Sequence, residues 1–124
     1  GSALPLDAEP EVIVKGRNYV TGLPRSVKIA TNEITKAIDV ELKTMIQAIK
    51  DVLAEVPPEL ASDIIDNGIT LTGGTSQLRN LPELIHRRTG VDAYLVDDPL
   101  FCVARGTGIA LEHLDTYKKA IISK

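Results

Sequence analysis

Aromatic residues, cysteine and methionine are scarce in this sequence. Its 124 residues include three tyrosines, one phenylalanine, one methionine, one cysteine and no tryptophan. The core must therefore be built mainly from Ile, Leu, Val and Ala. The single cysteine, Cys102, excludes an internal disulfide and is typical of a reducing cytoplasm.

Long apolar runs and an excess of basic residues are also missing. Fourteen Lys and Arg stand against seventeen Asp and Glu, which gives a net charge of −3. Surfaces that bind nucleic acid are normally basic, so we expect no nucleic-acid partner. No apolar run approaches the roughly 20 residues that cross a bilayer, and the N-terminus lacks a signal-peptide pattern. The sequence predicts one cytoplasmic domain.

The first third of the chain predicts a pair of strands. Apolar and polar residues alternate over residues 11–15, and residues 26–30 predict a second strand. Glycine, asparagine and proline between them favour a hairpin-like pair with a long connection. The composition of residues 1–10 suits a mobile lead-in, in which Gly1-Ser2 fits either a native segment or a cloning remnant.

A long amphipathic helix is predicted next, capped by Thr31 or Asn32 and running to about Glu55. Its apolar residues recur at spacings of three and four: Ile34, Ile38, Leu42, Met45, Ile46, Ile49, Leu53 and Val56. Such a stripe usually lies in the core, although a partner-binding face has the same pattern. Pro57-Pro58 ends this helix, and a shorter one over residues 58–67 is predicted to follow. That helix carries three apolar residues on one side: Leu60, Ile64 and Ile65.

The second half of the chain predicts a parallel strand–helix–strand unit. Residues 69–72 alternate as a strand does, after a glycine that indicates the end of the preceding helix. A helix over residues 81–89 follows, with Asn80 as N-cap, Glu83 at the capping-box position and Gly90 as its stop. The next strand covers residues 91–96, and the connection is expected to be right-handed.

The first of these strands ends in Gly73-Gly74, followed by Thr75 and Ser76. Two glycines allow a sharp bend and let a ligand approach the main chain without meeting a Cβ. A strand, a glycine turn and a helix in succession also place ligands at the carboxyl edge of an α/β sheet. The same glycines could serve only to let strand and helix pack closely, so their spacing alone leaves both interpretations open.

The last residues predict a further helix and a tail. Asp98 as N-cap and Pro99 at the first helical position indicate the start of the helix. Gly106 and Gly108 lie within it, and each costs about 1 kcal/mol relative to alanine. Close packing against the sheet or the glycine turn would explain why the helix keeps them. Residues 117–124 are expected to form a frayed basic tail.

No other group of residues predicts catalysis or metal binding. Asp97 and Asp98 are adjacent carboxylates, but helix capping explains them without a metal ion. Cys102 stands among apolar residues, so we expect a buried small side chain rather than a nucleophile. His86 and His113 lack the spacing of metal ligands. The basic residues at the end of helix 81–89 are expected to be solvated, although an anion could bind there: His86, Arg87 and Arg88.

Several segments taken together resemble the C-terminal end of the MreB family, the rod-shape-determining bacterial actin homologues. The resemblance runs from about Glu11 to Leu114. The segments that carry it are Gly16–Pro24, Pro57–Ile65, Gly68–Asn80, Asp98–Leu100 and Val103–Gly108. No one of these segments would be specific alone, but the combination is.

The resemblance implies an α/β fold, the C-terminal part of an actin-like (ribonuclease H-like) ATPase, with a mixed sheet packed with helices. Residues 1–31 would be the tail end of the small subdomain that caps the nucleotide, and residues 32–124 the C-terminal half of the neighbouring core subdomain. The adenosine-binding turn would be formed by Gly73, Gly74, Thr75 and Ser76. Family members commonly have a third glycine where Thr75 stands, and a glycine where Asn80 stands.

The function implied by the resemblance is that of part of an ATP-binding, filament-forming cytoskeletal protein that determines cell shape. Such a protein binds ATP with Mg²⁺, self-associates, and works with cell-wall synthesis and membrane-associated proteins at the inner face of the membrane. The phosphate-binding hairpins and catalytic carboxylates would lie upstream of residue 1, so we expect no ATP hydrolysis by these residues alone. Alternatives are a fragment of another actin-fold ATPase, such as a sugar kinase or chaperone, or a non-catalytic interaction domain.

Overall fold

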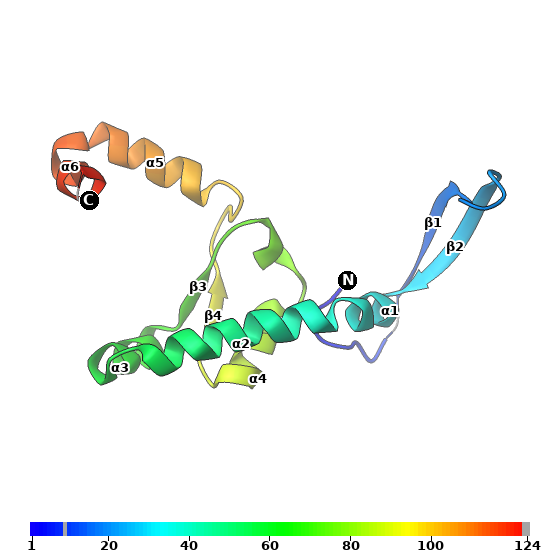
Figure 1. The fold of residues 1–124 in the computed structure, drawn as a ribbon, viewed down its shortest axis with the longest axis horizontal. Coiled ribbons are helices and arrows are strands. Elements are labelled where there is room, and N and C mark those ends of the chain that lie inside the picture. Colours follow the sequence, from blue (N-terminus) through cyan, green and yellow to red (C-terminus); the bar gives the residue numbers. More distant parts are fainter. Residues whose placement is uncertain (9, 123–124) are drawn as a thin grey trace.

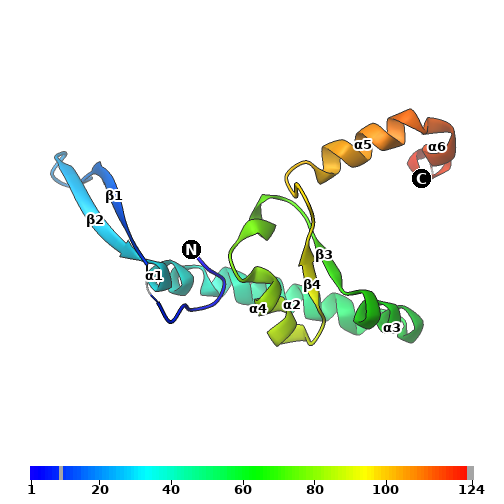
Figure 2. The same cartoon turned by 180° about the vertical axis from the view of Figure 1, so that it is seen from behind.

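The structure is a computed structural model that describes residues 1–8 and 10–122. It has a central body from which a hairpin and a pair of helices extend in different directions (Figure 1). The view from behind shows the same arrangement (Figure 2). The central body contains α2 (Asp39–Glu55), α3 (Pro58–Asn67), β3 (Ile69–Leu71), α4 (Leu81–Thr89) and β4 (Ala93–Leu95).

The predicted hairpin is confirmed, with longer strands than the sequence indicated. β1 (Glu11–Arg17) pairs antiparallel with β2 (Pro24–Ala30) along their whole lengths. Asn18 organises the connection, because its side-chain oxygen accepts the N–H groups of Val20 and Thr21 at 2.9 and 3.1 Å. Every residue of β1 is exposed, and the hairpin projects from the rest of the molecule (Figure 1).

The single long helix predicted from Thr31 to Glu55 is two helices. α1 (Thr31–Ala37) and α2 are separated by Ile38, whose φ of −96° and ψ of 1° depart from the helix. The predicted cap was also wrong. The N-cap residue is Ala30, whose N–H donates to the Glu33 carboxylate at 3.0 Å.

The side chains predicted to cap this helix are occupied elsewhere. The Thr31 hydroxyl donates to the carbonyl of Pro10 at 3.0 Å. The Asn32 amide exchanges hydrogen bonds with the backbone of Leu6, at 2.9 and 3.0 Å. These contacts tie the start of α1 to the N-terminal segment, which local sequence reasoning could not foresee.

The predicted parallel pair is confirmed, although β4 is shorter than residues 91–96. Ile69 lies opposite Ala93, and Leu71 lies opposite Leu95. Gly68 ends α3 as predicted, with a φ of 76°. Among the described residues, the parallel pair and the hairpin form separate two-stranded sheets, so the expected mixed sheet does not appear as one unit.

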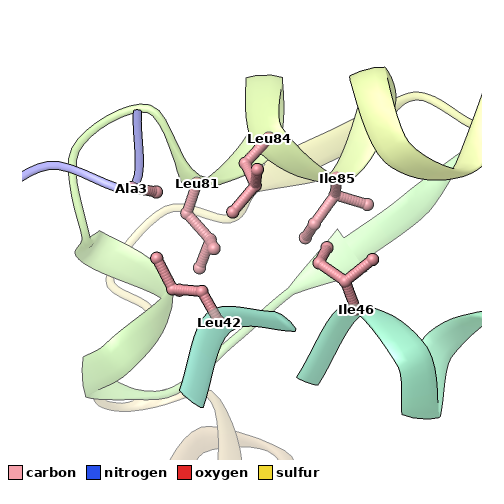
Figure 3. Close-up of a cluster of buried hydrophobic side chains, with 6 residues drawn as sticks. All are labelled: Ala3, Leu42, Ile46, Leu81, Leu84 and Ile85. Atoms are coloured by element: carbon pink, nitrogen blue, oxygen red, sulfur yellow. The ribbon is translucent and has the colours of Figure 1, made fainter. Parts of the chain in front are cut away.

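The core lies between α2 and α4 (Figure 3). Leu42 and Ile46 of α2 point towards three residues of α4, and Ala3 closes one side of the cluster. The α4 residues are those that the sequence placed inward: Leu81, Leu84 and Ile85. The interpretation of the α2 stripe as core is confirmed for this segment, whereas Leu60 and Ile65 of α3 are exposed.

Helix α4 covers the predicted residues, with Asn80 as its N-cap residue and Gly90 as its end, but the predicted cap hydrogen bonds are absent. Asn80 is the N-cap residue in a left-handed conformation, with a φ of 61°, and its side chain makes no cap hydrogen bond. It donates instead to Ser2 Oγ at 3.1 Å. Glu83 does not close a capping box either, because its carboxylate binds Arg87 Nε at 2.7 Å.

The N-terminal residues were wrongly predicted to form a mobile lead-in. Ser2 is fully buried and Ala3 is 5% exposed. Ala3 N–H donates to the carbonyl of Arg79 at 2.7 Å, and Ser2 forms a parallel β-bridge with Arg79. Their small side chains allow this close approach, which composition alone does not reveal.

The start of the last helices was also mispredicted. Asp98 has a φ of 50°, and its carbonyl accepts the N–H of Phe101 at 2.9 Å in a tight turn. Helix α5 (Cys102–Glu112) therefore begins after Phe101 rather than at Pro99. It is followed by α6 (Leu114–Ile122), so the expected frayed tail is helical up to Ile122, and residues 123–124 lie outside the described residues.

Helix α5 stands away from the central body (Figures 1 and 2). It has no buried residue, and a Cβ added at Gly106 or Gly108 would meet nothing within 4 Å. The close packing predicted from these glycines is therefore not present within the described residues. None of the helices in residues 1–8 and 10–122 combines the length and the apolarity of a membrane span.

Candidate functional site

The glycine turn lies where the parallel strands β3 and β4 both end. Gly73 has a φ of 84° and a ψ of 171°, a region that essentially only glycine adopts. Its N–H donates to the carbonyl of Pro99 at 2.8 Å, which ties the turn to the loop after β4. A Cβ added at Gly73 would meet nothing within 4 Å. The turn therefore presents bare main chain to open space.

The remaining predicted site residues form a single 3-10 turn, η1 (Gly74–Gln77). Gly74 and Thr75 are exposed, whereas Ser76 is 7% exposed and its hydroxyl donates back to the carbonyl of Gly73. The structure thus brings Gly73, Gly74 and Thr75 together on an accessible surface. It assigns Ser76 to holding the bend, because its hydroxyl is directed at the main chain.

The loop after β4 forms one wall of the site. A Cβ added at Gly74 would lie 3.2 Å from Leu100 Cδ2. A hollow of about 490 Å³ lies between this loop and Gln77, with Leu95 and Pro99 in its lining. Sequence reasoning missed Gln77 and Leu100 as site residues. The signal was available, since residues that follow neighbouring parallel strands meet at the same edge of a sheet.

A second hollow, of about 510 Å³, borders the turn on the side of α2. Gly74 and Thr75 line it together with Gln77 and a single ionisable residue, Glu41. The rest of its wall is apolar and comes from the start of α2 and the end of η1: Ile38, Leu42, Met45 and Leu78. The exposed part of the turn therefore borders a hollow whose wall is mainly apolar.

Two other groups flagged in the sequence have structural partners. His86 and Arg87 are exposed, as predicted. His86 Nδ1 lies 2.8 Å from Asp92 Oδ1, and Arg87 binds Glu83. Cys102 was expected to be buried but is half-buried, and its thiol donates to the carbonyl of Asp98 at 3.6 Å. Within residues 1–8 and 10–122, no three His, Cys, Asp or Glu residues gather as metal ligands would.

Comparison with known proteins identifies relatives along almost the whole chain. The family model described as MreB/Mbl protein matches residues 1–119. The cell shape-determining protein MreB of Escherichia coli K12 is 44% identical over 124 residues, which is all of this chain and 36% of that protein. The cell shape-determining protein Mbl of Bacillus cereus is 40% identical over 119 residues, or 96% of this chain and 36% of that protein.

Solved structures agree with the sequence comparison. MreB5 of Spiroplasma citri bound to ADP superimposes with a TM-score of 0.83 at 32% identity, over all of this chain and 37% of that one. The same protein bound to AMPPNP gives a TM-score of 0.83 at 30% identity, over 98% of this chain and 37% of that one. These likenesses confirm the predicted fold class.

The chain spans about a third of the length of these relatives. A match of this extent does not favour the alternatives of a sugar kinase, a chaperone ATPase or an unrelated interaction domain. The resemblance inferred from the sequence is confirmed, and this chain belongs to the MreB/Mbl family.

Proposed function

We propose that this chain is the C-terminal part of an ATP-binding, filament-forming protein that helps to determine cell shape. The observation that carries the proposal is the open backbone of Gly73 at the common end of β3 and β4. It is supported by the likeness to MreB5, whose solved structures hold ADP and AMPPNP. In the full-length protein ATP is bound with Mg²⁺, and the subdomain boundary near residue 31 separates the capping strands from the core.

The proposed role of this chain is to receive the adenosine part of the nucleotide. Gly73 and Gly74 offer open main chain, since Leu100 Cδ2 alone among the described residues lies within 4 Å of a Cβ added at either position. Thr75 is exposed and lines the hollow beside α2, so its side chain leaves the Gly73 face open. The bound nucleotide supplies the phosphate chemistry that drives filament turnover. The residues described here bind and orient its base and ribose.

Helix α5 exposes large apolar side chains, as expected of a surface that another part of the same protein covers. Val103 is 79% exposed and Leu111 is 66% exposed, although both are large and apolar. We propose that the rest of the full-length protein covers them. Filament formation, contact with cell-wall synthesis and membrane-associated proteins, and placement at the inner face of the membrane belong to that whole protein. No nucleic-acid partner is proposed.

The isolated 124 residues are expected to associate through this surface, because large apolar side chains in water favour burial. Sedimentation velocity should show concentration-dependent oligomers, and Val103→Lys with Leu111→Glu should shift them towards monomer. Val40→Lys is the matched control, since Val40 is 67% exposed on α2. A monomer at all concentrations would contradict the proposed cover.

The nucleotide site is tested by Gly73→Ala in the full-length protein. The added methyl lies on the open face of the turn, so the affinity for ATP and for ADP should fall at least about tenfold. Gly90→Ala is the control, because Gly90 also has a positive φ, of 77°, and open space around it, but it ends α4. Calorimetric titration measures both variants. Equal affinities in Gly73→Ala and the parent protein would sink the proposal.

We expect the 124 residues alone not to hydrolyse ATP, because the groups that bind phosphates and orient water belong to the rest of the actin-like fold. Phosphate release by the purified chain, measured with Mg²⁺ and ATP, should equal the buffer blank. Gly74→Val controls for contaminating enzymes, because it blocks the turn next to Leu100. Turnover that needs Mg²⁺ and is lost in Gly74→Val would contradict this expectation, whereas turnover that persists in Gly74→Val would come from a contaminating enzyme.

A further inference from the structure

A buried polar cluster joins the N-terminal segment to the residues that follow the 3-10 turn η1. Ser2 Oγ accepts the side-chain N–H of Asn80 at 3.1 Å and donates to the carbonyl of Arg79 at 3.3 Å. The Thr35 hydroxyl donates to the carbonyl of Ser2 at 2.8 Å. Ser2 is fully buried and Thr35 is 6% exposed. These hydrogen bonds thus hold together residues that lie 77 and 78 positions apart in the sequence.

The hydrogen bonds of this cluster are not explained by the capping of α4. Buried polar side chains destabilise a fold unless they are paired, and no buried side-chain nitrogen or oxygen among the described residues lacks a partner. Asn80 adopts a φ of 61°, which glycine would accept as easily. Its amide does not cap α4. Within the described part of the chain, what the Asn80 side chain adds is therefore the hydrogen bond to Ser2.

The link fixes one end of the segment that carries the turn. Residues 73–80 lie between β3 and α4, outside both sheets. At the start of this segment, the Gly73 N–H donates to the carbonyl of Pro99 at 2.8 Å. At its end, the Arg79 carbonyl accepts the Ala3 N–H, and the Asn80 side chain donates to Ser2 Oγ. Hydrogen bonds therefore hold residues 73–80 at both of their ends.

We infer that Ser2 and Asn80 are positioning residues for the nucleotide, a latch that holds the glycine turn in the geometry that receives adenosine. The inference rests on the proposed nucleotide site. The latch acts through the backbone of residues 73–80 and touches no ligand. The latch joins the residues that follow the turn to the N-terminal segment.

The test uses Asn80→Gly in the full-length protein, since glycine keeps the backbone conformation and removes the amide. Nucleotide affinity should fall about two- to tenfold, the size expected for one lost hydrogen bond. Hydrogen exchange of the Gly73–Gln77 amides should accelerate, while exchange in α2 stays unchanged. Asn67→Gly is the matched control, because the Asn67 amide is exposed and donates to the carbonyl of Asp63, four residues away, at 2.9 Å.

Ser2→Ala and the double variant complete the test. If the two residues act as one latch, the double variant should lose no more affinity than Asn80→Gly alone. Additive losses, an unchanged affinity in Asn80→Gly, or faster exchange spread over the whole body would each overturn the inference. Gly73→Ala, measured alongside, separates the two proposals: the latch alone fails if Gly73→Ala weakens binding and Asn80→Gly does not.

Discussion

Replacing Ile85 with alanine is expected to lower the free energy of unfolding by about 2–5 kcal/mol. Ile85 is 1% exposed and lies in the cluster that joins α4 to α2. The described core is small, so neighbouring side chains can close the cavity only partly. Natural domains are stable by about 5–15 kcal/mol, and this one change removes a large share. Urea denaturation followed by circular dichroism measures the loss.

The matched control for this prediction is Ile65→Ala. Ile65 is 65% exposed on α3, so the same chemical change should alter the free energy of unfolding by no more than about 0.5 kcal/mol. Equal losses at the two positions would mean that the α2–α4 interface is not where this protein is held together.

Helical periodicity was the most reliable guide to the fold. The spacing of Leu81, Leu84 and Ile85 identified both the extent of α4 and its buried face. The same argument placed Leu42 and Ile46 in the core. Periodicity is a good guide here because the two helices pack against each other and bury apolar residues of both in one cluster.

Assigning helix caps from residue type was less reliable, because some of these side chains bind partners far away in the sequence. Asn80 and Thr31 were assigned to helix caps by their residue type, yet they bind Ser2 and Pro10. Asp98 and Pro99 looked like a helix start, but Asp98 adopts a positive φ and closes a turn with Phe101. Local propensity cannot rank the contacts of Asn80 and Thr31, because their energies depend on residues up to 78 positions away. At Asp98 it could not distinguish a tight turn from a helix start, because both are local and favour the same residues.

The candidate site was predictable in outline. The sequence located the bend at Gly73-Gly74, since two glycines after a short strand allow a sharp turn, although their spacing alone left close packing as an alternative. It could not show that Ser76 turns inward, that Leu100 approaches Gly74, or that Gly73 rather than Gly74 has the positive φ that favours glycine. Those features depend on how η1 and the loop after β4 meet in space.

The second large effect is expected at Gly68. Its φ of 76° and ψ of −171° nearly match the 84° and 171° of Gly73, so alanine at either position carries a strain of about 1–3 kcal/mol. At Gly68 the added Cβ would also overlap the Tyr94 ring and lie 2.8 Å from the carbonyl of Asp92. That carbonyl accepts the N–H of Ile69 at 2.8 Å, beside the first pair of β3 and β4.

Gly68→Ala should therefore destabilise the protein by about 3–5 kcal/mol, and Gly73→Ala by only the strain of about 1–3 kcal/mol. Thermal and urea unfolding of the two variants measure the difference. Their effects on nucleotide affinity should run the other way, because the methyl at Gly73 faces open space where the ligand is proposed to bind, whereas the methyl at Gly68 faces β4. Equal destabilisation by both variants would contradict the close approach of Gly68 to β4, and with it the parallel pairing that brings the site residues to one edge.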